Sequence, residues 1–211
     1  LGKIDAIIPP KEQVSTEEYN VHDRLKVYIL NVRKTTKGAQ ITASRTHFEL
    51  VKRLFELEVP EVYDGTVEIK GLVREAGSRT KMAVFSKNSD VDAIGACIGN
   101  NGNRVAVIIN ELRGEKIDIL NWSEDPKVYI TEALKPCKVL AIELCEEEKS
   151  AKVVVLDDQL SLAIGKEGQN VRLAARLTGW KIDIKNETQA KSTNFIDFDN
   201  KEVYIIDKNA N

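Results

Sequence analysis

The sequence predicts a multidomain α+β protein, and three observations support this fold class. The first residues alternate as β-strands do, the middle of the chain contains one helix-and-strand pattern twice, and the end has a separate hairpin-like segment. Length alone favours one or two domains, because the chain has 211 residues and domains most often contain roughly 100 to 150. The repeat raises that expected number, since each copy is shorter than an average domain.

Residues 1–45 are predicted to form part of a small β-sheet. The apolar stretch 3–8 ends at Pro9, and proline cannot donate a hydrogen bond to a neighbouring strand. Residues 25–30 alternate with a period of two, which is typical of a strand, and residues 39–43 follow a glycine turn as its hairpin partner. These segments supply about three strands.

Residues 46–123 are predicted to form the first mixed domain. The apolar spacing becomes helical after residue 46, and Pro60 ends that helix because the residue before a proline avoids the helical conformation. We expect, in order, a helix, two strands, a short helix, a glycine loop, a longer helix and a closing strand. Their residues are 47–57, 66–73, 81–85, 90–96, 99–102, 103–112 and 116–120.

Residues 124–186 repeat this order and are predicted to form the second mixed domain. The copies read Ile-Gly-Asn-Asn-Gly from Ile98 and Ile-Gly-Lys-Glu-Gly from Ile164, and both close with Lys-Ile-Asp-Ile. One Gly-x-x-Gly is a weak signal, whereas two in the same frame are a strong one. The expected elements are 126–135, 139–144, 152–156, a helix from 158, the loop 165–168, a helix to 177 and a strand to 184. Residues 187–211 are predicted to be a polar linker and a tail hairpin.

The two Gly-x-x-Gly loops are the candidate functional sites. Glycine at both ends removes the Cβ atoms, so the backbone of a ligand can approach the loop closely. The helix that follows presents unpaired N–H groups and the positive end of its dipole, which together suit a phosphate. The alternative is a tight turn between helices, which the duplication disfavours. A nucleotide-dependent enzyme is rejected, because Gly-x-x-x-x-Gly-Lys-Ser/Thr is absent.

The arrangement of two helices, the loop and an adjacent strand resembles the KH domain, whose loop clamps about four nucleotides of RNA. The helix-first order indicates the bacterial form, type II. The resemblance implies an apolar groove for the bases, between the helix after the loop and the neighbouring strand. That groove would be lined by Val105, Ile108 and Ile119 in the first copy and by Val171, Ala175 and Ile184 in the second.

Charge distinguishes the two copies. Three basic and three acidic residues cancel between Ile98 and Ile119, whereas five basic residues and two acidic ones give +3 between Ile164 and Lys185. The whole chain carries −2, so any binding of nucleic acid must come from local patches. We therefore expect the second loop to contribute more of the affinity for phosphate.

The chain from residue 1 to 186 resembles the NusA family of bacterial transcription factors. The resemblance is carried by residues 2–13, Arg45, Leu57 to Glu61, 92–99, 114–119 and 163–174. It implies an OB-type barrel of which residues 1–45 are a part, followed by two type II KH domains in tandem. It also implies a factor without enzymatic activity or cofactor that modulates pausing, termination and antitermination. The implied partners are single-stranded nascent RNA, RNA polymerase and antitermination factors.

By position, the resemblance assigns RNA contacts to both loops and to the start of the helix after each. The residues are Gly99, Asn100, Asn101, Gly102 and Arg104, then Gly165, Lys166, Glu167, Gly168, Gln169, Asn170 and Arg172. The chain departs from the family at Asn100 and Asn101, where a basic residue is usual. Because asparagine brings no charge, the first loop is expected to position RNA more than to attract it.

The number of strands in residues 1–45 leads to a hypothesis about the tail. An OB barrel needs five strands, and this segment supplies about three. Residues 194–207 have the length and pattern of the missing pair, so we hypothesise that they return to complete the barrel. An exposed sheet edge would otherwise be a liability. The alternative is a flexible tail.

The sequence disfavours two other functions. The first is the RNA-binding accessory region of a phosphorolytic exoribonuclease, but such enzymes carry one KH domain before the barrel, whereas here a barrel precedes two. The second is a ribosomal or structural role, which the modest charge disfavours. Three cysteines and two histidines without ligand spacing predict no metal site. No apolar run approaches the roughly 20 residues that cross a bilayer, and no secretion signal is seen, so we expect a piece of a larger cytoplasmic protein.

Overall fold

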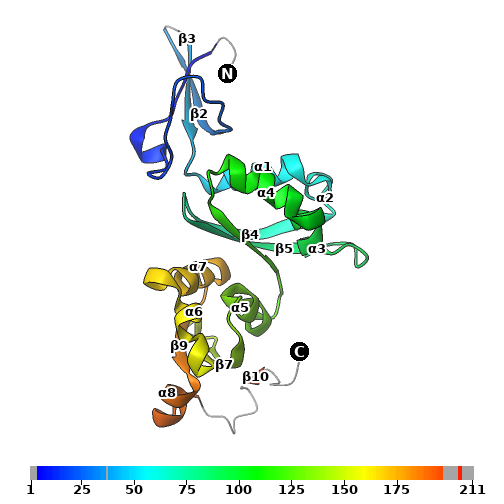
Figure 1. The fold of residues 1–211 in the computed structure, drawn as a ribbon, viewed down its shortest axis with the longest axis vertical. Coiled ribbons are helices and arrows are strands. Elements are labelled where there is room, and N and C mark those ends of the chain that lie inside the picture. The colour runs from blue at the N-terminus through cyan, green and yellow to red at the C-terminus, as the bar shows by residue number, and fades with distance from the viewer. Residues whose placement is uncertain (1–3, 37, 197–203, 206–211) are drawn as a thin grey trace. The chain divides into compact units, whose positions relative to one another are not determined.

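The computed structural model describes residues 4–36, 38–196 and 204–205, and it divides into two units, residues 1–119 and 120–211. Figure 1 shows the order of the elements along the chain. The expected α+β class is confirmed, because each unit contains helices packed on a β-sheet. Within the described residues, none of the helices combines the length and apolarity needed to span a membrane.

The first unit begins with a three-stranded sheet. Its strands are β1 (Ala6–Ile7), β2 (Tyr28–Thr35) and β3 (Gly38–Ser44), in the order β1-β3-β2. β2 and β3 form the expected hairpin, while β1 pairs with β3 in parallel. β2 is longer than the predicted strand and begins three residues later. The number of described strands agrees with the prediction for this segment.

The first mixed domain follows the predicted order, with one addition. Its elements are α1 (Phe48–Glu58), α2 (Pro60–Tyr63), β4 (Val67–Glu75), β5 (Arg79–Ser86), α3 (Ala93–Ile98), α4 (Asn103–Glu111) and β6 (Lys116–Asn121). The sequence did not predict α2. Pro60 ends α1, but it also starts α2, because the fixed φ of proline and its missing N–H suit the first position of a helix.

The core of this domain lies between its helices and the sheet β4-β5-β6. Apolar residues at helical spacing on α1 meet the inward face of β5 and the buried face of α4. The buried members are Leu50, Val51, Leu54, Phe55, Val59, Val67, Met82, Val84, Ala93, Cys97, Ile108 and Leu112. This packing holds α3 and α4 in place on either side of the first glycine loop.

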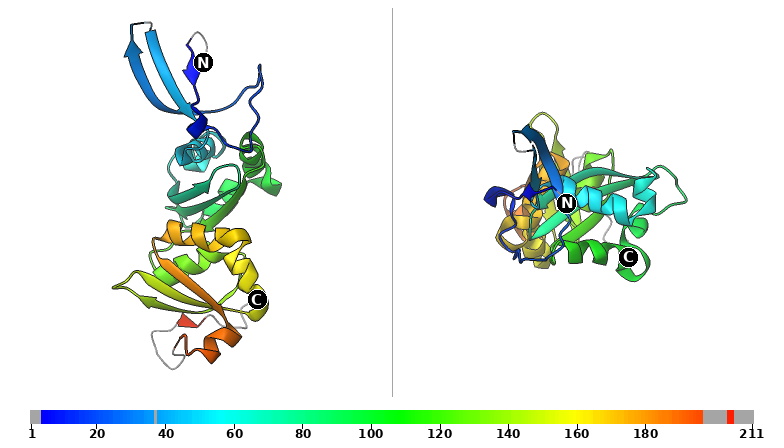
Figure 2. Two further views of the ribbon diagram at one scale, coloured as in Figure 1. Left: turned by 90° about the vertical axis from the view of Figure 1, so that its left-hand side faces the viewer. Right: turned by 90° about the horizontal axis from the view of Figure 1, so that it is seen from above.

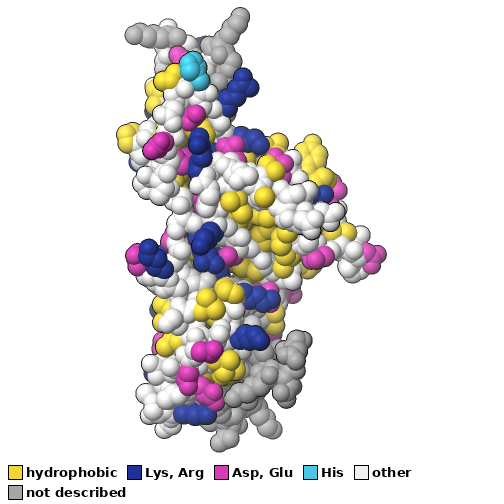
Figure 3. Space-filling view, in the orientation of Figure 1, with side chains coloured by type: hydrophobic (Ala, Val, Ile, Leu, Met, Phe, Trp, Pro, Cys, Tyr) yellow, Lys and Arg dark blue, Asp and Glu magenta, His cyan; other side chains and the backbone are white. Residues whose placement is uncertain are grey.

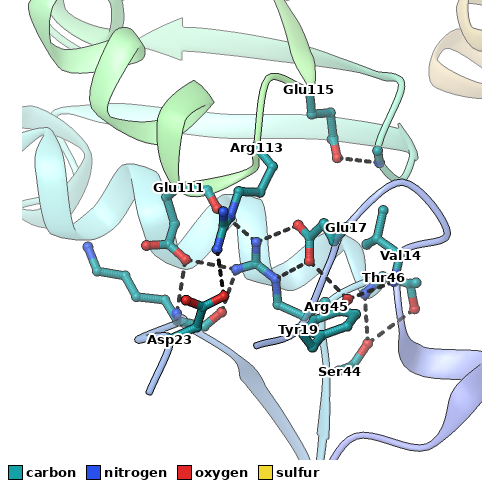
Figure 4. Close-up of polar contacts among 12 residues, drawn as sticks. Val14, Glu17, Tyr19, Asp23, Ser44, Arg45, Thr46, Glu111, Arg113 and Glu115 are labelled. Carbon is teal, nitrogen blue, oxygen red and sulfur yellow. Dashed lines mark hydrogen bonds and ion pairs between the residues drawn. The ribbon is translucent and has the colours of Figure 1, made fainter. Parts of the chain in front are cut away.

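A buried ionic cluster joins the three-stranded sheet to the first mixed domain. Arg45 follows β3 and is fully buried, and its guanidinium donates to both carboxylate oxygens of Glu17. It also donates to the carboxylate of Glu111 at 2.8 Å, to the backbone oxygen of Glu111 at 2.8 Å and to that of Lys26 at 2.7 Å (Figure 4). Since Glu111 is the last residue of α4, the cluster ties this helix to the sheet.

The second mixed domain also has the predicted order. It consists of α5 (Pro126–Leu134), β7 (Val139–Cys145), β8 (Ser150–Val155), α6 (Leu160–Ile164), α7 (Gln169–Thr178) and β9 (Lys181–Asn186). Val153, Val154 and Val155 are all buried, which requires cover on both faces of the sheet, because successive side chains of a strand point in opposite directions. The left view of Figure 2 shows α5, α6 and α7 on one side of this sheet and α8 on the other.

The start of the tail belongs to the second mixed domain and is not the predicted linker. Residues Glu187–Ser192 form the helix α8, which begins with a capping box between Asn186 and Gln189. Phe195 and Ile196 are buried with Ala190 against Ala141 of β7 and Val154 of β8. These contacts supply the second cover of the sheet.

The hypothesis that the tail completes the barrel is wrong for its described strand. β10 (Tyr204–Ile205) pairs antiparallel with Ala141 and Ile142 of β7, so it adds an edge strand to the sheet of the second mixed domain. The physical reason is local: α8 and the buried Phe195 and Ile196 direct the chain along this sheet. The rest of the predicted hairpin lies outside the described residues.

Candidate nucleic-acid interface

The two glycine loops have the same backbone conformation. Gly99 has φ 75° and ψ 174°, and Gly165 has φ 76° and ψ 174°, a combination that only glycine adopts readily. Each loop then makes a single tight turn, in which the N–H of the second glycine donates to the carbonyl of the first at 3.1 Å and 3.2 Å. The repeated sequence therefore adopts the same backbone torsion angles in both loops.

The last two residues of each loop are both left-handed. Asn101 and Gly102 have φ 52° and 76°, and Glu167 and Gly168 have φ 53° and 73°. Asparagine and glycine accept this conformation readily, whereas an ordinary side chain such as that of Glu167 is strained in it. The second loop therefore has the same backbone conformation as the first, although Glu167 is strained in it.

The first and second glycines of each loop have different surroundings. A Cβ on Gly99 would lie 2.3 Å from Asn103 Oδ1, and one on Gly165 would lie 2.9 Å from the backbone nitrogen of Asn170. By contrast, a Cβ on Gly102 would meet no described atom within 4 Å, and one on Gly168 would meet only Arg172 Nη1, at 4.0 Å. The first glycine of each loop thus faces protein atoms, which are side-chain atoms at Gly99 and include backbone atoms at Gly165, whereas the second glycine borders open space.

The helices that follow the loops begin without a capping side chain. α1, α3, α5 and α8 are each capped at their N-terminus, by His47, Asp92, Asp125 and Asn186 respectively. The N-cap residues of α4 and α7 are Gly102 and Gly168, which have no side chain that could accept a hydrogen bond from the first turn of the helix. The N–H groups of Asn103 and Gln169 donate to the carbonyls of Asn100 and Lys166. The positive end of each helix dipole lies beside the open glycine, where it favours an anion.

Arg104 and Asn170 occupy the same position after the two loops and have internal partners. The Arg104 guanidinium donates to the carbonyl of Ala96 at 2.7 Å. The Asn170 amide donates to the carbonyls of Ala163 at 3.0 Å and Leu134 at 3.1 Å. Each side chain therefore braces the end of the helix before its loop.

Asn170 is only 3% exposed and its amide hydrogens are used internally, while its assignment to RNA contact stays a prediction. Arg104 is half-buried and forms an ion pair with Glu61 at 2.9 Å. The sequence motif places both residues correctly but does not show these partners.

The second loop carries the positive charge. Lys166 and Arg172 are exposed, and Arg172 Nη1 donates to the carbonyl of Glu167 at 3.0 Å, which holds the guanidinium over the loop. At the equivalent positions the first loop has the exposed and uncharged Asn100 and Ala106. Figure 3 shows basic and acidic side chains interspersed on the face it displays, without one continuous basic field. Of the equivalent positions compared here, only those of the second copy carry positive side chains.

One of the predicted groove residues belongs to the core instead. Ile108 is 1% exposed and packs against the buried residues of α1 and β5, so the expectation that it lines a groove for bases is wrong. Helical spacing explains the error, because one turn separates the buried face of α4 from its exposed face. Val105 and Ile119 are half-buried at the edge of that core, and Val171, Ala175 and Ile184 are half-buried in the second copy.

The thiol nearest the first loop is buried and unreactive. Burial, with a smaller contribution from Glu61, raises the pKa of the Cys97 thiol to about 12, so this group just before the first loop stays protonated and unreactive. Among the residues that the structure describes, no three side chains of His, Cys, Asp or Glu gather as metal ligands would. The arrangement is suited to binding a phosphate backbone.

Two mixed domains with the same glycine loop define the chain as a tandem KH protein. Residues 45–122 match the NusA-like first KH domain, and residues 126–192 match the NusA-like second KH domain. The chain belongs to the NusA family. The second match includes all of α8, which lies beyond the predicted end of that domain at residue 186.

Curated relatives agree with this assignment. The transcription termination/antitermination protein NusA of Bacillus subtilis is 61% identical over 191 residues, which cover 90% of this chain and 52% of that protein. NusA of Halalkalibacterium halodurans is 58% identical over 197 residues, covering 93% and 52%. NusA of Thermus thermophilus is 50% identical over 182 residues, covering 86% and 47%. The chain spans about half the length of these relatives.

Proposed function

We propose that this chain is the RNA-binding region of a bacterial transcription termination/antitermination factor. In this role it holds single-stranded nascent RNA at RNA polymerase and, together with antitermination factors, modulates pausing, termination and antitermination. It binds RNA without catalysing a reaction or using a cofactor, and it works in the cytoplasm, where bacterial transcripts are made. The names of its relatives and the two matched KH domains support this proposal.

The observation that carries the proposal is the pairing of an open glycine with an uncapped helix in both copies. Gly102 and Gly168 border open space, and α4 and α7 start there without a capping side chain from the described residues. A phosphate can approach the peptide groups at this point and accept hydrogen bonds from the first turn of the helix. A turn that only connects two helices does not require an open glycine and an uncapped helix in both copies.

The two loops would make unequal contributions. The second would supply most of the electrostatic attraction through Lys166 and Arg172, with Gln169 beside them at the start of α7. The first would fix the position of the strand through the backbone of residues 99–102 and the side chains of Asn100 and Asn101. The exoribonuclease alternative has no observation in its favour, because the relatives quoted above are NusA proteins.

The test uses the open glycines, where a new side chain meets no protein atom closely. Gly102→Asp and Gly168→Asp place a negative charge beside the expected phosphate, and each should weaken binding of a single-stranded RNA by about tenfold. Gly168→Asn is the matched control, because asparagine has the same shape, tolerates the left-handed conformation and brings no charge. The binding isotherms should show Gly168→Asn close to wild type. If all three variants bind RNA as the wild type does, the loops do not hold the RNA backbone.

A further inference from the structure

The side chains of Arg104 and Asn170 make equivalent hydrogen bonds, but arginine is charged and asparagine is neutral. Both follow the second glycine by two residues, and the torsions of the two loops agree closely. Both donate to a carbonyl near the end of the preceding helix. A neutral amide is therefore sufficient for the brace in the second copy, so the charge of Arg104 in the first copy is not needed for it.

Glu61 cancels that additional charge. It lies on α2 and accepts from Arg104 Nη1 at 2.9 Å, the same nitrogen that donates to Ala96. The side chains of Arg104 and Glu61 are 29% and 31% exposed, so the pair lies within reach of solvent and of a bound ligand. An ion pair of this exposure is weak, and a phosphate at the neighbouring loop could compete for the guanidinium.

We propose that Glu61 is an affinity-setting residue of the first loop, because it holds the Arg104 charge on α2 and keeps that loop electrically neutral toward RNA. This inference rests on the proposed RNA-binding function and adds a regulator of it outside the loops. The first loop then selects RNA by shape and hydrogen bonds, while the second supplies the salt-dependent attraction. Removing the charge of Glu61 should therefore increase affinity, which damage to the fold would not do.

The central variant is Glu61→Gln in the full chain. Glutamine keeps an oxygen that can accept from Arg104, so the brace at Ala96 should persist while the charge is lost. Freeing one cation for one phosphate adds about 0.7 to the salt slope for single-stranded RNA, which corresponds to about fivefold tighter binding at 0.1 M salt. The control is Glu68→Gln on β4, which removes the same charge from the same domain, where Glu68 pairs with Lys70 and Lys87.

Two further variants test the inference even if Glu61→Gln does not fold. If Glu61 already keeps Arg104 from phosphate, Arg104→Asn, which installs the residue of the second copy, should leave the salt slope unchanged. It should lower the affinity modestly, because the charge of Glu61 then lacks its partner beside the loop. The double variant Glu61→Gln with Arg104→Asn should return to wild-type affinity. Thermal unfolding of each variant shows whether the first KH domain has remained folded.

The outcomes separate this inference from the proposed function. Tighter binding and a steeper slope for Glu61→Gln alone, with Glu68→Gln unchanged, would support the role of Glu61. Equal behaviour of the two glutamine variants, or a slope that falls by about 0.7 in Arg104→Asn, would overturn it, because Arg104 would then already contact phosphate. The proposed function would still stand if Gly168→Asp weakened binding in the same assay. If the wild type bound no RNA, both ideas would be wrong.

Discussion

Arg45 and Glu17 form a doubly hydrogen-bonded ion pair in which the arginine side chain is completely buried and the glutamate almost so. Arg45 also neutralises Glu111 at the end of α4. A single cation therefore serves two carboxylates, one from the segment before β2 and one from the first KH domain. Removing it leaves both negative charges without their partner.

Arg45→Met is accordingly predicted to lower the free energy of unfolding of the first unit by about 3–5 kcal/mol. Urea unfolding followed by circular dichroism measures the loss, and hydrogen exchange should locate it around residues 14–45. Arg53→Met is the control, because Arg53 forms an exposed pair with Glu56 and should cost at most about 1 kcal/mol. Equal losses in the two variants would mean that the buried cluster does not stabilise the joint.

The two glycines of one loop should differ in their tolerance of alanine. Gly165→Ala combines a torsion reserved for glycine with a Cβ 2.9 Å from the backbone nitrogen of Asn170, and should cost about 3 kcal/mol of stability. Gly168→Ala should lower stability by only about 1 kcal/mol, because its one cost is the left-handed conformation. Thermal unfolding compares them directly. A greater loss for Gly168→Ala would contradict the assignment of the first glycine to packing.

The charge of the second loop should appear in the salt dependence of RNA binding. Lys166→Ala with Arg172→Ala is expected to reduce the slope of log K against log salt by about 1.4, since each lost phosphate contact removes about 0.7. Asn100→Ala with Asn101→Ala should leave that slope unchanged and lower affinity only through lost hydrogen bonds. Fluorescence anisotropy at four salt concentrations distinguishes the two. Unchanged slopes in both double variants would remove the proposed asymmetry between the loops.

Asp118 should make stability depend on acid pH. Its burial alone would raise the pKa, but the hydrogen bond from Arg79 and the charge of Lys81 outweigh burial and hold the pKa below its usual value. Because the pKa is lower in the folded state, the stabilisation is present above the unfolded value of about 3.9 and is lost as pH falls through the folded value.

Asp118→Asn should therefore destabilise the protein at pH 7 by roughly 1.5–3 kcal/mol, and this difference should shrink as the pH falls from about 3.9 through the lower folded pKa. Thermal unfolding across this range provides the comparison. Asp183→Asn, at the exposed equivalent position of the second copy, is the control and should change stability by no more than about 0.5 kcal/mol. A constant difference between wild type and Asp118→Asn at all pH values would show that the carboxylate charge is not the cause.

Thiol labelling should separate the buried cysteines from the exposed one. The thiolate is the reactive form, and a pKa of about 12 leaves Cys97 almost entirely protonated at pH 8. Cys145 is exposed, so it should be alkylated in the native protein, whereas the buried Cys97 and Cys137 should react only after unfolding. Mass spectrometry of the labelled peptides reads this out. Rapid native labelling of Cys97 would mean that the helix before the first loop opens.

The repeat made the two KH domains predictable, because each local signal agreed with the next. The helical spacing after residue 46, the two strands and the glycine loop all favoured one fold, and a second copy removed the ambiguity. The helix α8 was missed although a signal was present: Asn186 and Gln189 have the spacing of a capping box, and Ala190 supplies an apolar face. The polar composition of this segment favoured a linker instead.

The roles of individual loop residues were less predictable. Asn170 and Arg104 have partners on other helices, and Glu61 lies 43 positions before Arg104, so no local pattern connects them. The prediction that Ile108 lines a groove was wrong for a related reason. Periodicity identifies the apolar residues of a helix, but it does not show which of them lie in the core and which line a surface groove. Open space beside Gly102 and Gly168 is likewise a property of the folded chain.

The buried cluster around Arg45 also limits how this protein can be dissected. The NusA-like first KH domain is recognised from residue 45 onward, yet the backbone N–H of Arg45 donates to Glu12 and its side chain to Glu17 and Lys26. An excised fragment starting at residue 45 would expose a guanidinium stripped of most of its acceptors. The smallest fragment that folds by itself with an intact first loop should instead begin before Glu12. The start of the family match at residue 45 therefore differs from the start of the folding unit.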